Sequence, residues 1–253
     1  LSAVFLSSIS ANWSAGSPPN RPGTRYLLQA SSMAFAPNEV IVASDTANVS
    51  DIVTGLLSDT TYELRVEVLN YNGVPARLQL GSTVTFAEPP GAPFLAAVFQ
   101  TSAAVSWTPV GAQGYRLEAS STNFGAALPG GLTLASATAN GAVSGLIVPG
   151  LERNTTYYFR VASLNWNSAA NFAVLGASST LAAPVTGAQI YGVFETSATL
   201  NWAALAASPQ AATSEGYRLQ ASSTNFGALL PGGALLSSST TNAALSTLTV
   251  SGL

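Results

Sequence analysis

The sequence predicts an all-β protein in which β-sandwich units are arranged end to end along 253 residues. Two observations lead to this prediction. Segments such as Tyr157, Phe159 and Val161 place residues on one face at period two, which is typical of a strand with one buried side. The same order of tryptophan, tyrosine and turn residues also recurs along the chain, which indicates duplication of a module. A chain of this length can hold two or three sandwich domains, each with its own core.

Each unit begins with two strands that lead to a tryptophan. A Val-Phe pair precedes the tryptophan by the same step in every unit, which fits a second strand entering the core. A tyrosine then opens a third strand that ends in Ala-Ser-Ser. These markers are Trp13 and Tyr26, Trp107 and Tyr115, and Trp202 and Tyr217.

A Gly-Leu corner followed by a strand tyrosine comes next. Leu56 precedes Tyr62, and Leu151 precedes Tyr157 by the same step. This is the sequence form of a tyrosine corner, in which the phenol packs inward and its hydroxyl bonds to upstream backbone. The third unit reaches its corner at 252–253 without the strands that should follow. We therefore expect the chain to be a window cut from a longer polypeptide, with Trp202 and Tyr217 facing water.

The remaining strands are expected by their alternation and by the turn residues that bound them. In the first unit they are predicted at 25–32, 48–54, 62–70 and 77–86. In the second they are predicted near 147, from 157 onward, and at 172–180. We interpret 123–145, which is rich in Gly, Ala and Ser, as an excursion between the third strand and the corner.

With these residues in view, the chain resembles tandem fibronectin type III domains, which are immunoglobulin-like β-sandwiches arranged end to end. The resemblance covers nearly all of the chain and implies domains at 1–88, with the start of its first strand cut, at 89–184, and a partial domain at 185–253 that lacks strands F and G. An immunoglobulin domain would more typically pair its tryptophan with a disulfide, and the chain has no cysteine. The resemblance implies a structural core of Trp13, Trp107, Trp202, Tyr26, Tyr115, Tyr217, Leu56, Leu151, Tyr62 and Tyr157.

The segments between units differ in proline content. The first linker, 87–93, holds three prolines, which restrict the backbone, so we expect a semi-rigid joint there. The second linker, 181–185, is shorter and holds one. The segments 115–131 and 217–233 differ at only two positions. This near identity favours a repetitive array.

Composition argues against several kinds of chemistry. Cysteine, histidine and lysine are all absent, so thiol, imidazole and Schiff-base catalysis and the common zinc sites are excluded. We predict no enzyme activity, no catalytic residues, no cofactor and no metal site. Charged residues make up 8% of the chain and the net charge is −3, so we expect no positively charged surface that could bind nucleic acid. No apolar run reaches about 18 residues, so we expect no membrane insertion in this segment.

The few charged residues on strands are expected to form exposed ladders. Glu63 and Glu67 share an outward face with Arg65 between them, and Arg116 and Glu118 are expected to face Arg160 on the neighbouring strand. Exposed pairs of this kind contribute about 0–1 kcal/mol each.

Two further patterns have alternative interpretations. Asp45, Asp51 and Asp59 could bind calcium, although their spacing matches no loop motif, and hydrogen bonding in turns explains them better. Glycosylation sequons occur by sequence at Asn12, Asn48 and Asn154, and such matches arise often by chance in a chain rich in Ser, Thr and Asn.

Two aromatic residues follow the predicted F strands. Tyr71 and Trp166 each come one residue after an asparagine, in the loop between strands F and G. In the resembled family this loop is a frequent recognition site, so each residue is a candidate for contact with a ligand. The alternative is packing against the loop base or the adjoining domain, and we favour it.

The sequence leaves three functions open. The first is a structural repeat segment of an extracellular or cell-surface protein, expected to be bacterial, that forms a stalk, fibre, filament or sheath. Its partners would be neighbouring repeats, and its low charge would allow lateral self-association into a filament or layer. The second is an adhesin, or a module that binds carbohydrate or a surface protein through its F–G loops. The third is a spacer in a secreted polysaccharide-degrading enzyme.

Overall fold

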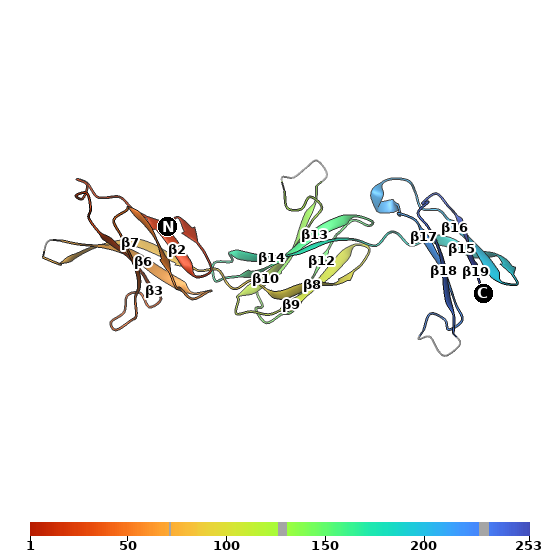
Figure 1. Cartoon of the computed structure of the whole chain (residues 1–253), viewed down its shortest axis with the longest axis horizontal. Helices are drawn as coiled ribbons and strands as arrows, with labels where there is room; N and C mark the ends of the chain where they lie inside the picture. The colour runs from red at the N-terminus through yellow and green to blue at the C-terminus, as the bar shows by residue number, and fades with distance from the viewer. Residues whose placement is uncertain (71, 126–130, 228–232) are drawn as a thin grey trace.

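The computed structural model describes residues 1–70, 72–125, 131–227 and 233–253. Three β-sheet units follow one another along the longest axis of the molecule (Figure 1). In the described part of the chain, the only helical turn is the short η1 (Gln210–Ala212). The predicted all-β fold is therefore confirmed.

The first unit packs a three-stranded sheet against a four-stranded one. The first sheet has the order β1-β2-β5 and the second has the order β4-β3-β6-β7, with antiparallel neighbours throughout. The strands are β1 (Ala3–Val4), β2 (Ser8–Asn12), β3 (Tyr26–Ser31), β4 (Val42–Thr46), β5 (Ser50–Thr54), β6 (Thr61–Leu69) and β7 (Pro75–Val84).

The second unit repeats this arrangement. Its sheets have the orders β12-β9-β8 and β11-β10-β13-β14. The strands are β8 (Gly91–Val98), β9 (Ser102–Thr108), β10 (Gly114–Ser120), β11 (Thr133–Thr138), β12 (Gly145–Pro149), β13 (Thr156–Leu164) and β14 (Ala170–Ser179). Three strands facing four, as in an immunoglobulin-like sandwich, give each of the first two units a fibronectin type III-like architecture.

The third unit has the same first sheet and two strands of the second. Its orders are β15-β16-β19 and β17-β18. The strands are β15 (Thr186–Phe194), β16 (Ser197–Ala203), β17 (Tyr217–Ser222), β18 (Leu235–Thr240) and β19 (Thr247–Ser251).

A tilted tryptophan–tyrosine pair lies in each unit. The ring centroids are 5.7 Å apart for Trp13 and Tyr26, and 4.9 Å apart for Trp107 and Tyr115. Tyr217 packs on Trp202 at the same 4.9 Å and is only 9% exposed, so the expectation that it faces water was wrong. Trp202 itself is half-buried.

The Gly-Leu corners place their leucines and tyrosines inside the sandwiches. Leu56, Tyr62, Leu151 and Tyr157 are all buried. The Tyr62 hydroxyl accepts a hydrogen bond from the Leu57 amide, and the Tyr157 hydroxyl accepts one from the Glu152 amide, each at 3.0 Å. Burial raises the pKa of Tyr157, which favours the neutral phenol.

Two strands and one strand start were not foreseen. The strand β4 pairs with β3, and β11 lies inside the segment interpreted as an excursion. Residues of β11 alternate between exposed and half-buried positions, and Leu134 packs on the core. This short strand therefore forms one edge of the four-stranded sheet. The strand β8 begins at Gly91, so the ordered first linker is shorter than 87–93.

Candidate functional site

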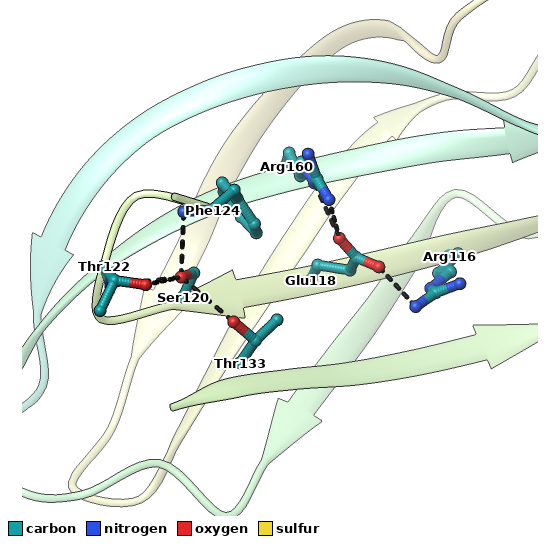
Figure 2. Close-up of polar contacts among 7 residues, drawn as sticks. All are labelled: Arg116, Glu118, Ser120, Thr122, Phe124, Thr133 and Arg160. Atoms are coloured by element: carbon teal, nitrogen blue, oxygen red, sulfur yellow. Dashed lines mark hydrogen bonds and ion pairs between the residues drawn. The ribbon is translucent and has the colours of Figure 1, made fainter. Parts of the chain in front are cut away.

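Two groups of polar residues stand out, and the first surrounds Glu118 on β10 (Figure 2). The Glu118 carboxylate forms ion pairs with Arg116 and Arg160, each at 2.6 Å. Glu118 is only 3% exposed. The predicted contact among these residues is present, but the prediction of an exposed ladder was wrong for Glu118. Its carboxylate is buried between the two guanidinium groups, whereas Arg116 reaches solvent.

Aromatic rings enclose the arginine of this cluster. The Arg160 guanidinium lies 3.9 Å from the ring centroid of Phe124 and 3.9 Å from that of Phe172. Phe124 is held in place because its amide donates to the Ser120 hydroxyl oxygen at 3.1 Å, as Figure 2 shows. The negative charge of a carboxylate that is bonded to two guanidinium groups is fully neutralised. The cluster therefore links strands β10 and β13 and offers no free acid or base.

The first unit carries the same arrangement without the carboxylate. Arg65 stacks on Phe35 at 3.7 Å and donates to the Gln29 side-chain oxygen at 2.7 Å. Glu67 pairs with Arg77 at 2.9 Å. The predicted ladder of Glu63, Arg65 and Glu67 was therefore wrong, because Arg65 turns toward strand β3 and the aromatic ring.

The three aspartates proposed for calcium lie in separate settings. Asp45 pairs with Arg25 at 3.0 Å, and Asp59 contacts the second unit. Across residues 1–70, 72–125, 131–227 and 233–253, no group of three or more acidic, histidine or cysteine side chains is placed to hold a metal ion.

The second group of polar residues lies between the first two units, and Asn165 is at its centre. This side chain, at the end of β13, is only 2% exposed. Its Nδ2 donates to the backbone carbonyls of Val84 and Thr85, at 3.2 and 3.0 Å. Its Oδ1 accepts from the amides of Asn167 and Ala169, which closes the turn between β13 and β14. A single amide thus holds its own turn and the preceding unit together.

The first two residues of the first linker are bonded to the second unit. The Ser163 hydroxyl donates to the Glu88 carbonyl at 2.5 Å, and Asn171 Nδ2 donates to the Ala87 carbonyl at 2.8 Å. Ala87 is fully buried and Pro90 is buried. Side-chain bonds, as well as the prolines, therefore fix this segment.

The corner of the first unit completes the contact. Asp59 Oδ2 accepts from the Gln113 side-chain amide at 2.9 Å, and Asp59 Oδ1 accepts from the Trp166 backbone amide at 3.2 Å. We call the set of Asp59, Gln113, Asn165 and the carbonyls of Val84 and Thr85 the first joint.

The contact between the second and third units uses the equivalent corner. Asn154 Nδ2 donates to the Thr213 hydroxyl at 2.8 Å and to Glu215 Oε1 at 3.2 Å. The Asn154 carbonyl accepts from the Gln210 side-chain amide at 3.0 Å. We call Asn154, Gln210, Thr213 and Glu215 the second joint. The Asn154 sequon thus lies at an inter-unit contact.

The predicted site residues lie partly at these joints. Tyr71 lies outside the described residues. Trp166 is 66% exposed, while its backbone amide is bonded across the first joint.

The predicted core residues are buried in most cases. Those of the second unit are buried together, and these are Trp107, Tyr115, Leu151 and Tyr157. Those buried in the other two units are Tyr26, Leu56, Tyr62 and Tyr217, whereas Trp13 and Trp202 are half-buried.

Sequence reasoning did not assign Asn165, Asp59 or Asn154 to a contact between units, although Asp59 was considered for calcium and Asn154 for glycosylation. The available signal was the recurrence of asparagine at the end of strand F, at Asn70 and Asn165, and of Asp or Asn at one corner position. Neither pattern tells which side chains face another unit.

Comparison with known proteins gives structural similarity without a sequence family. No protein-family model matches the chain, and no curated protein matches it. A crystal structure of the FN1–FN3 domains of chicken CNTN1 is 15% identical over 99% of this chain and 86% of that chain, with a TM-score of 0.31. A two-domain fibronectin type III segment of chicken tenascin is 20% identical over 69% of this chain and 95% of that chain, with a TM-score of 0.38. The fold assignment rests on the strand order within each unit.

No helix in the described part of the chain has the length and apolar character needed to span a membrane.

Proposed function

We propose that this row of fibronectin type III-like sandwiches is a non-enzymatic structural spacer that holds its units in fixed succession, as part of a stalk, fibre, filament or sheath outside the cell or on its surface. The buried Asn165 amide, which bonds the carbonyls of the preceding unit, is the observation that carries the proposal. A flexible string of domains would have no side chain of the next unit bonded to the carbonyls at the end of the preceding one. The internal duplication and the low charge of the chain give further support.

Spin-label distances between the first two units test the proposal. Because the chain has no cysteine, labels can be attached after the substitutions Ala47→Cys, directly after β4, and Ala135→Cys, in β11; both positions are exposed and lie in different units. The unaltered joint is expected to give one narrow distance distribution by double electron–electron resonance. Asn165→Asp is expected to broaden it, since a carboxylate oxygen would then face two carbonyls, at a cost of about 2–4 kcal/mol.

A matched control exists at the same turn of the first unit. Asn70 Oδ1 accepts from the amides of Asn72 and Val74, as Asn165 Oδ1 does in its own turn, but Asn70 is exposed. Asn70→Asp should therefore leave the distribution narrow. A broad distribution in the unaltered chain, or equal broadening by both substitutions, would contradict a spacer with fixed joints.

A second candidate function is recognition of a carbohydrate or surface protein, and the exposed Trp166 indole favours it. An exposed indole can stack on a sugar ring. For this function, Trp166→Ala should abolish binding on a glycan array while leaving the melting temperature unchanged. Loss of thermal stability without any change in array signals would assign Trp166 to packing.

A further inference from the structure

In both joints the same corner position contacts the same position of the next unit, but the acid and the amide have exchanged places. Asp59 and Asn154 occupy the same corner position, three residues before Tyr62 and Tyr157. In the first joint the corner supplies a carboxylate that accepts from Gln113. In the second the corner supplies an amide that donates to Glu215. In each joint, the corner residue and the residue that faces it therefore form one acid–amide pair.

The backbone restricts what the corner position can present. Asp59 and Asn154 both have φ of 47°, in the left-handed region that favours Gly, Asn and Asp. Their amides donate to equivalent carbonyls, of Phe86 at 3.0 Å and Leu181 at 3.2 Å. Aspartate and asparagine are thus the two side chains that keep this geometry and still reach the next unit. A change between them alters charge and hydrogen-bond direction but little else.

The facing position is also equivalent in the two joints. Gln113 and Glu215 each lie two residues before the tyrosine of the third strand, Tyr115 or Tyr217. Glutamine and glutamate have nearly the same shape, so this position too changes only its charge and donor capacity. If the first corner met the third unit, Asp59 would face Glu215, and two carboxylates would lie within hydrogen-bonding reach of each other without a donor between them.

We propose that this acid–amide pair docks each unit onto the unit that follows it, because the corner residue and the facing residue are complementary in charge and hydrogen bonding. The proposal rests on the spacer function, because it concerns how neighbouring units are held in the row. The partner of such a corner is the next sandwich of the same kind. A corner with Asp docks on a unit that carries Gln two residues before its third-strand tyrosine, and it docks poorly on one that carries Glu there. A corner with Asn docks on Glu.

Mismatched and rematched pairs test docking by the acid–amide pair in the whole chain. Gln113→Glu places two acids in the first joint, and Asn154→Asp does the same in the second. The double substitutions Asp59→Asn with Gln113→Glu, and Asn154→Asp with Glu215→Gln, restore one acid and one amide in reversed positions. Labels at Ala47→Cys and Ala135→Cys report on the first joint, and labels at Ala135→Cys and Thr241→Cys report on the second.

Each single substitution is expected to lower the ratio of docked to undocked units about five-fold, which corresponds to a repulsion of about 1 kcal/mol between unit charges at 4 Å in water. Each double substitution should restore the narrow distribution. In 1 M salt, where the screening length is about 3 Å, the single-substitution effect should shrink. A loss of packing alone would not respond to salt in this way.

The outcomes separate this proposal from the spacer function. Narrow distributions in the unaltered chain, together with single substitutions that change nothing or double substitutions that fail to restore docking, would overturn docking by the acid–amide pair and leave the spacer function standing. Broad distributions in the unaltered chain would overturn both.

Discussion

Replacing Trp107 with alanine is expected to destabilise the second unit by about 3–5 kcal/mol, the usual cost of removing a large buried aromatic side chain. Trp107 is 3% exposed and packs on Tyr115, which is fully buried. Its indole Nε1 has no hydrogen-bond partner among the described residues, so packing is what the side chain supplies. For a unit of this size, the loss lowers the melting temperature by on the order of 10–30 °C.

The first unit provides the control for this substitution. Trp13 occupies the same position but is only half-buried, and its ring centroid is farther from its tyrosine partner. Trp13→Ala should therefore cost less, about 1–3 kcal/mol, because less apolar area returns to water. Calorimetry of the whole chain, with hydrogen exchange of β13 and β6 amides to assign each transition, measures both losses. Equal losses at the two positions would argue against burial as the cause.

Glu118→Ala is expected to destabilise the second unit by about 2–4 kcal/mol. The substitution removes the shared partner of two arginines and leaves the Arg160 guanidinium between two aromatic rings with no anion to bond. The figure lies below that for a fully buried pair because Arg116 and part of Arg160 reach solvent, where water screens the charge. Denaturant unfolding followed by β10 hydrogen exchange measures it.

Glutamine at the same position should be tolerated far better. Gln29 occupies the equivalent position in the first unit and accepts from Arg65 at 2.7 Å. Glu118→Gln keeps an acceptor for Arg160 and should cost about 1 kcal/mol, the net value of one hydrogen bond. If glutamine destabilised the unit as much as alanine, the charge of Glu118 rather than its hydrogen bonding would be the main contribution.

Much of the fold could be predicted because its signals are local. Alternation at period two marks the buried faces of β6 and β13, where Tyr62 and Tyr157 alternate with exposed or half-buried neighbours. The strands β4 and β11 were harder to predict. Both are short, both consist largely of Ala, Ser and Thr apart from one or two larger residues, and each is stabilised by pairing with the strand that precedes it in the chain.

The β-sandwich class, the core markers Trp107 and Tyr157 and the lack of thiol and imidazole chemistry follow from the amino-acid sequence alone. The burial of Glu118, the bond from Asn165 to the preceding unit, and the contacts of Asp59 with Gln113 and of Asn154 with Glu215 emerge only when the sheets and units pack. The two groups differ in how far apart in the chain the interacting residues lie. Periodicity reports what one strand does within a few residues, whereas burial and inter-unit bonding depend on residues that lie tens of positions apart and meet only when the sheets pack.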